Sequence, residues 1–216
     1  MGVVEIDHAN HQIHLMATIF FYGDASDEII SRQIARDIEE HWNEPKATVV
    51  INQNEYSTQF TIHGVHAAFL QPKDIYENDN PFNNYFRLEE YSNLDISFVD
   101  GIGSNTGYFK LANLLHHSTT AAHEFGHTLG LIHPHQLDIR GTGTPGIMYP
   151  RGTIVDPVFQ YDPSAAPATK GGTLNPIYRK VLQQDIDDLR LHKLPFNKNH
   201  QAVVGQFTSV WHDKHS

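Results

Sequence analysis

The chain of 216 residues contains no cysteine. A chain without thiols cannot form a disulfide, a thiolate metal site or a cysteine nucleophile, so any metal ion must be bound by His, Asp or Glu. The redox state of its compartment is left open by this absence. Histidine, in contrast, is abundant, with 16 residues.

Positive charge and long apolar runs are also scarce. The 15 Lys and Arg residues are outnumbered by 25 Asp and Glu residues, which gives a formal net charge of −10. Nucleic acids and anionic membranes repel such a chain, so neither is expected as a partner. No segment approaches the roughly 20 apolar residues that a membrane span needs, and "MGVVEIDHANHQIHL" lacks the pattern of a signal peptide. We expect a soluble chain.

Hydrophobic periodicity predicts an α+β fold in one domain. The segment 24–44 has the apolar spacing of an amphipathic helix, and 175–192 is predicted as a second helix capped by Asn175. The segment 71–93 is rich in Asn, Asp and Pro and is predicted to be mostly loop. Five β-branched or aromatic segments are predicted as strands: 11–23, 47–53, 57–70, 94–100 and 106–113.

The segment "HEFGHTLGLIH" (123–133) has the spacing of a metal site. On a helix, His123 and His127 project from one face one turn apart, which suits two nitrogens on one ion. Gly130 permits the positive φ that ends the helix and turns the chain back, so that His133 is placed to supply a third ligand. Glu124 lies at the rim of the same face, within reach of a metal-bound water.

Three neutral imidazoles leave the fourth position of a zinc ion open to water, whose pKa falls to about 7 in such sites. Glu124 is then the candidate general base. The alternatives are a core helix with incidental histidines and a closed structural metal site. Both are disfavoured because all five positions of the pattern His-Glu-x-x-His-x-x-Gly-x-x-His are filled.

With these residues the sequence resembles the metzincin metallopeptidases. "GIMYP" (146–150) is similar to the methionine turn of the matrixin branch, and the resemblance implies that Met148 forms an apolar floor under the histidine rings. "LQQDIDDLR" (182–190) is similar to the matrixin segment in which a buried Asp bonds that turn, and Asp185 takes its place. Gln184 and Gly152 depart from the matrixin pattern.

The resemblance implies a zinc-dependent endopeptidase that acts on polypeptides, with one catalytic Zn²⁺. It also implies a twisted, mixed, five-stranded sheet with two helices in an upper subdomain (about 1–133). The lower subdomain (about 134–216) is expected to be irregular, with the methionine turn and a C-terminal helix. In this family an edge strand binds extended substrate, and 104–111 is our candidate. The loops "YENDNPFNN" and "VDGIGSN" suit Ca²⁺ as a second candidate ion. We expect a monomer.

Two rival hypotheses stay open. The same chemistry suits a toxin or effector domain at the C-terminus of a larger secreted protein, and export as part of such a precursor is the localisation that we favour. The chain is alternatively a zinc-binding module that holds a peptide without cutting it. Glu124 argues against the second rival, because a module that only binds has no need of a general base.

Overall fold

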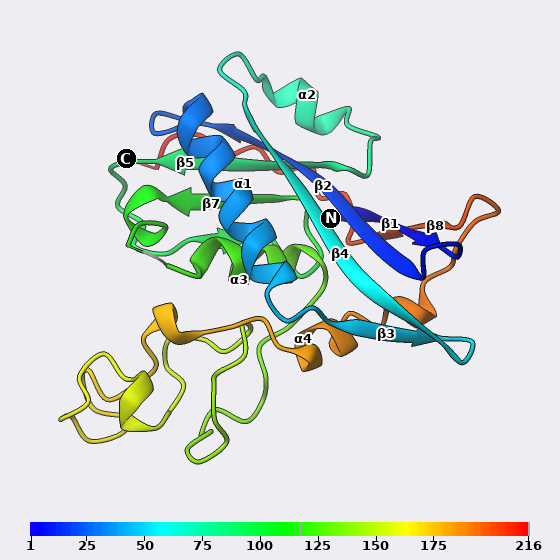
Figure 1. Cartoon of the computed structure of the whole chain (residues 1–216). Helices are drawn as coiled ribbons and strands as arrows, with labels where there is room; N and C mark the ends of the chain where they lie inside the picture. Colours follow the sequence, from blue (N-terminus) through cyan, green and yellow to red (C-terminus); the bar gives the residue numbers. More distant parts are fainter. Residues whose placement is uncertain (117, 216) are drawn as a thin grey trace.

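The protein is built on one mixed sheet, shown by the computed structural model of residues 1–116 and 118–215 (Figure 1). Six strands follow the order β3-β4-β2-β5-β7-β6, β1 pairs with β2, and β8 pairs with β1. These described residues thus form an eight-stranded sheet, and the prediction of five strands is wrong. The strands are β1 (Gly2–Asp7), β2 (Gln12–Tyr22), β3 (Thr48–Ile51), β4 (Asn54–His66), β5 (Asn83–Glu89), β6 (Phe98–Val99), β7 (Thr106–Lys110) and β8 (Gln201–Val204).

All five predicted strands are present, and three others were missed. β5 lies at the centre of the sheet, parallel to both β2 and β7, although it was assigned to a loop. Its two leading asparagines and the turn-forming residues before it concealed a short buried run that contains Tyr85, Phe86 and Leu88. β1 and β8 are the other two, and they pair with each other in antiparallel register at the side of β2.

The helices are short apart from α1. The predicted helix 175–192 is wrong as a single element, because a 3-10 turn (Pro176–Tyr178) and an extended link precede the α-helix that begins at Gln183. Asn175 does accept a hydrogen bond from Ile177 N, but as the cap of that 3-10 turn. The α-helices are α1 (Glu28–Asn43), α2 (Pro72–Tyr76), α3 (Thr120–Thr128) and α4 (Gln183–Asp188).

α1 crosses one face of the sheet and holds α3 in place (Figure 1). Asp27 caps its first turn by accepting a hydrogen bond from Ile30 N at 2.8 Å. Its buried stripe includes Ile34, Ile38 and Trp42, whereas Ile29 is exposed. The Trp42 indole donates to the carbonyl of Ala122 at 3.1 Å, so the two helices are joined by packing and by a buried hydrogen bond.

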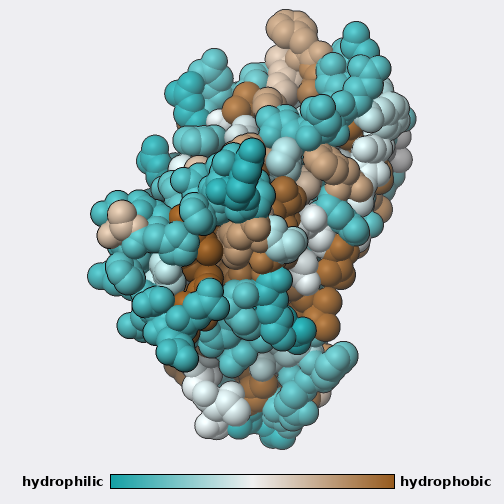
Figure 2. Space-filling model, turned by 90° about the vertical axis from the view of Figure 1, so that its right-hand side faces the viewer, coloured by the Kyte–Doolittle hydropathy of each residue, from teal (hydrophilic) through white to brown (hydrophobic). Residues whose placement is uncertain are grey.

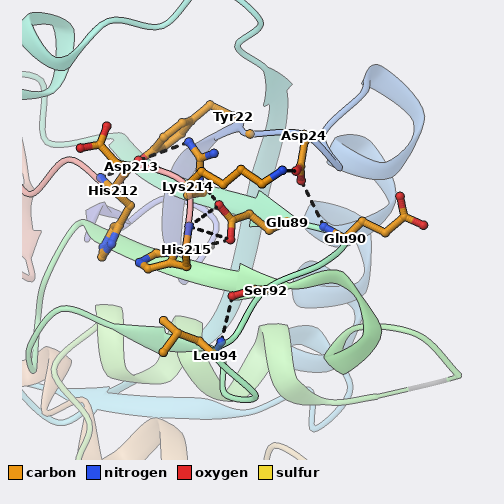
Figure 3. Close-up of polar contacts among 12 residues, drawn as sticks. Tyr22, Asp24, Glu89, Glu90, Ser92, Leu94, His212, Asp213, Lys214 and His215 are labelled. Carbon is orange, nitrogen blue, oxygen red and sulfur yellow. Dashed lines mark hydrogen bonds and ion pairs between the residues drawn. The ribbon is translucent and has the colours of Figure 1, made fainter.

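The C-terminal residues return to the sheet. β8 pairs with β1, and farther on Lys214 Nζ lies 2.8 Å from Asp24 Oδ2 (Figure 3). His215 N donates to the buried carboxylate of Glu89 at 3.1 Å, as the same view shows. The predicted division into two subdomains at about residue 133 stays a prediction. These contacts place the last residues of the chain, which were assigned to the lower subdomain, beside the sheet of the upper one.

Residues 137–174 form loops below α3 and α4, drawn in yellow-green to yellow in Figure 1. A separate small apolar cluster of Ile139, Val155 and Leu174 lies within them. On the face turned toward the viewer in Figure 2, hydrophilic residues predominate and hydrophobic residues show between them. No helix in the described part of the chain is long and apolar enough to cross a bilayer.

Candidate metal centre

The end of α3 is shaped by Gly130. This residue adopts φ +99°, a region that side-chain-bearing residues rarely occupy. Its N–H donates to His127 O at 3.0 Å, and Leu131 N–H donates to Gly126 O at 3.0 Å, which is the bonding pattern of a Schellman motif. The chain therefore reverses at once, and Leu131 O accepts a hydrogen bond from His127 Nδ1 at 2.8 Å.

Three imidazoles converge where the chain turns back. His133 Nε2 lies 3.1 Å from His123 Nε2 and 3.0 Å from His127 Nε2. In the described residues these three form a group of nitrogens that could hold one metal ion, and two of the rings are buried while that of His133 is exposed. The sequence-predicted ligand set is thus brought together in space.

Hydrogen bonds at the far nitrogens decide whether the donor set fits a metal. His123 Nδ1 lies 2.7 Å from Ile147 O and 2.9 Å from Arg179 Nη1. A carbonyl can only accept, so Nδ1 carries the proton and Arg179 donates to Tyr149 O at 3.1 Å instead. His127 Nδ1 likewise donates to a carbonyl. The unprotonated Nε2 atoms of these two rings therefore both face His133 Nε2, and this arrangement of nitrogen lone pairs fits a shared metal ion.

Burial keeps these rings neutral. Desolvation is the first cause that lowers the pKa of His123, well below its ordinary value, and the positive charge of Arg179 lowers it further. Desolvation also lowers the pKa of His127 and of His133. Neutral imidazole is the form that binds metal, so the fold supplies the ligands already deprotonated at neutral pH.

Glu124 is buried beside the three rings, with 8% of its surface exposed. Burial raises the pKa of its carboxyl to about 8, although Arg179, the main-chain amide of Val99 and Arg151 each lower it in part. A carboxyl with a pKa near neutrality is suited to accept and return a proton. Val99 belongs to β6, and this strand borders the same cavity as the candidate base.

Met148 packs against α3 at Gly126, and its role as a floor under the histidine rings stays a prediction. The side chain is 3% exposed, and a Cβ added to Gly126 would lie 2.4 Å from its sulfur and 3.3 Å from Trp42. Gly126 therefore permits the close approach of the methionine turn to the helix that carries His123 and His127. The carbonyl of Ile147, next to Met148, is the one that orients His123.

Asp185 bonds the main chain of the methionine turn and that of the start of its own helix, α4. Its Oδ2 accepts from Leu182 N at 2.7 Å and from Ile147 N at 3.4 Å. Desolvation raises the pKa of this carboxyl to about 6; the main-chain hydrogen bonds lower it and the charge of Asp188 raises it. Its contact with the residue beside Met148 agrees with the contact that the sequence resemblance implies.

Two cavities meet at Glu124, and both include His123 and His133. One, of about 350 Å³, lies along β6 and also reaches Phe98, Val99, Ile102 and His127. The other, of about 240 Å³, extends toward Ser97, Thr120, Pro150, Arg151 and Arg179. A larger cavity, of about 730 Å³, touches His133 and Met148 but not Glu124, so the two smaller ones are the candidate reaction space.

The prediction that 104–111 is the edge strand that binds substrate is wrong. It corresponds to β7, which pairs with β5 on one side and β6 on the other, so it has no free edge. β6 ends the strand order and lines the cavity beside Glu124. With only two paired residues, β6 is too short for a sequence pattern to rank it above its neighbour.

Arg179 was missed for a different reason: nothing in "NPIYRKV" signals that this arginine is buried.

Comparisons with known proteins add a distant likeness. No protein-family model and no curated protein matches the chain. One solved structure, archaemetzincin from Methanopyrus kandleri, matches 82% of this chain and 95% of its own with a TM-score of 0.40 and 13% identity. A likeness of this size carries no argument about function. The closer similarity to matrixins is not supported by these comparisons, and the role of Ca²⁺ stays a prediction.

Proposed function

We propose that the protein is a zinc-dependent endopeptidase that hydrolyses peptide bonds in polypeptides. The observation that carries this proposal is the convergence of three imidazole Nε2 atoms beside a buried carboxyl with a raised pKa. His123, His127 and His133 would hold the ion. Zinc in such a site polarises a carbonyl and lowers the pKa of a bound water to about 7.

Side chains and main-chain carbonyls of the protein supply the other parts of the mechanism. Glu124 takes a proton from the attacking water and passes it to the leaving amine. Ile147 O and Leu131 O hold the rings of His123 and His127 through their Nδ1 protons. Burial of both rings and of Glu124 limits competing bulk water around the reacting groups.

β6 supports the choice of a polypeptide substrate. It is the end strand of the order that leads from β3 to β6, and it borders the cavity that contains Glu124. An extended peptide that adds to such a strand is held through main-chain hydrogen bonds, and its carbonyls pass in front of the imidazoles. The substrate is therefore recognised as an extended chain rather than as a small molecule.

The test is a mass-spectrometric cleavage profile on a proteome-derived peptide library, with the zinc-loaded protein beside its Glu124→Gln variant. We expect cuts by the parent alone, because the amide cannot take the proton from water. Intact peptides with one zinc bound per chain would favour the module that binds without cutting. Equal cutting by parent and variant would reveal a contaminating peptidase and leave the proposal without support.

A further inference from the structure

Arg179 is a buried cation next to the candidate metal centre. It is 4% exposed and has no part in the proton transfer described above. Its Nε donates to Thr119 Oγ1 at 2.9 Å and its Nη1 donates to Tyr149 O at 3.1 Å. Both partners are neutral, and Nη2 makes no hydrogen bond to any described residue. Nη2 is thus left as the donor that is available to a ligand.

Arg179 has no carboxylate as a direct partner within the described residues, and the carboxyl of Glu124, the candidate proton carrier, acts on its charge only through space. Its hydrogen bonds include no carboxylate, and it forms no ion pair among residues 1–116 and 118–215. Asp95, a carboxylate on the wall of the same cavity, is paired with Lys110 at 2.7 Å. Buried charges are ordinarily paired, because an isolated one is costly to desolvate. A missing anion is therefore to be sought in a ligand.

The cavity beside Arg179 has the position and charge for such an anion. It has a volume of about 240 Å³, and its wall includes Glu124, His123 and a second arginine, Arg151. Arg151 is exposed and follows the methionine turn directly. Two guanidinium groups thus border a space that is continuous with the candidate reaction centre. A peptide that lies across Glu124 would place the side chain of a residue that flanks the scissile bond in this space.

We propose that Arg179, assisted by Arg151, binds a carboxylate of the substrate in this cavity, and that the site thereby selects peptide bonds flanked by Asp or Glu. This inference rests on the proposed function, because it assigns a subsite of the same cleft. Arginine suits the role because its planar, rigid donor groups recognise carboxylates with two parallel hydrogen bonds. The free C-terminal carboxylate of a short peptide has the same chemistry and is distinguished below.

A purely structural role is the rival explanation. Arg179 joins Thr119, at the start of α3, to the main chain after Met148, so its loss is expected to loosen the site. A structural tie would lower kcat/KM for every substrate by a similar factor. A carboxylate subsite would instead lower the ratio of kcat/KM between a charged substrate and its neutral isostere. The ratio is therefore the quantity to measure.

The experiment uses the zinc-loaded protein and matched peptides that contain one cleavable bond. Four peptides carry Asp or Asn at one of the two positions that flank the bond. Two further peptides end one residue after the bond, with either a free carboxylate or an amide. For the parent we expect kcat/KM about ten- to a hundredfold higher for Asp than for Asn at one position, as for hydrogen bonds to a charged group. Calorimetric binding of the same peptides to zinc-loaded Glu124→Gln protein gives a second readout without turnover.

Two variants and one control separate the explanations. Arg179→Gln should bring the Asp-to-Asn ratio close to one. Arg151→Gln should lower the ratio less, and since Arg151 is exposed this variant tests the subsite even if the first does not fold. Arg36→Gln removes one positive charge from the exposed side of α1 and should leave the ratio unchanged. A preference for acid over amide that Arg179→Gln abolishes would assign the same subsite to a C-terminal carboxylate.

Three results would overturn the inference. If the parent cleaves the Asp and Asn peptides equally, and also the peptides with a free or an amidated C-terminus, the protein has no carboxylate subsite. The endopeptidase proposal would be unaffected by that result. A ratio that survives in both arginine variants would assign the preference to other groups. A parent that cuts none of the library and none of these peptides would contradict the proposed function and this inference together.

Discussion

The sheet region and the irregular segment 137–174 achieve their structures by different means. The main apolar cluster joins strands and helices of the sheet region and includes Phe21, Ile38, Trp42, Phe60 and Phe125. The irregular segment adds only Ile147 and Met148 to that cluster and has a separate three-residue cluster of its own; otherwise it depends on turns and on side-chain hydrogen bonds to its main chain. The candidate base and two of the three candidate metal ligands therefore lie on the regular, well-packed helix α3, while the walls of the cavity beside them come from both regions.

A few contacts around the methionine turn connect the two regions, and we call them the link. Met148 packs under α3, Ile147 O orients His123, and Asp185 bonds Ile147 N. These contacts couple the position of a candidate metal-binding ring to residues within the irregular segment and to α4, which follows it. We therefore expect changes on α3 to abolish chemistry, changes at the link to reduce stability, and changes in the cavity wall to alter substrate choice.

The largest effect is expected from the chemistry of α3. Glu124→Gln should lower kcat by about 10² to 10⁴, the usual contribution of a general base, while one zinc stays bound per chain. Steady-state kinetics and metal analysis on the same samples check this. A variant that loses zinc as well as activity would show that Glu124 serves the metal site itself.

Asp185 provides a pH-dependent test of the link. Its pKa of about 6 in the folded protein lies above the ordinary value of 3.8, so ionisation of this carboxyl destabilises the fold. The loss of unfolding free energy is absent below about pH 4 and complete above about pH 6. Relative to Asp185→Asn, the parent should lose up to about 3 kcal/mol of unfolding free energy between pH 4 and pH 7.

Urea unfolding of both proteins at several pH values measures that difference, and the histidines common to both cancel. Asp187→Asn, which alters an exposed carboxylate of the same helix, is the matched control and should show little pH-dependent change. A parent that becomes more stable than Asp185→Asn as pH rises would reverse the assigned sign.

Gly126 tests the packing between the regions. An added Cβ would lie 2.4 Å from Met148 Sδ, so Gly126→Ala should lower the unfolding free energy by about 1–3 kcal/mol through overpacking and weaken zinc binding. Gly152→Ala is the control, because a Cβ there meets no atom within 4 Å. Thermal unfolding and a zinc titration compare the two variants, and equal stability would mean that Met148 is not held against α3.

The smallest expected effect is on the number of protons that the protein releases when zinc binds. Glu124, with a pKa of about 8, is largely protonated at pH 7, and a dication beside it would lower that pKa. Zinc binding at pH 7 should therefore release close to one proton more from the parent than from Glu124→Gln. Calorimetry in buffers of different ionisation enthalpy measures this, and equal release would place the carboxylate away from the ion.

Sequence reasoning reached the parts of the site that are local in the chain. His123, Glu124 and His127 lie on the helix α3, and Gly130 lies beyond its end with a positive φ, as the local pattern predicts. The central strand β5 escaped because its asparagines resemble a loop. The segment 175–192 has a helical apolar pattern, but tertiary contacts hold it as a 3-10 turn and the short helix α4. Arg179 and the free edge of β6 depend on contacts between distant segments, which local patterns do not encode.

The most direct test of the metal centre is a titration of metal-free protein with Zn²⁺, followed by the rate at which a peptide found in the library profile is cleaved. We expect no cleavage without metal, a rate that rises in proportion to zinc, and a plateau at one ion per chain. Cleavage that persists without metal and is indifferent to added zinc would contradict it.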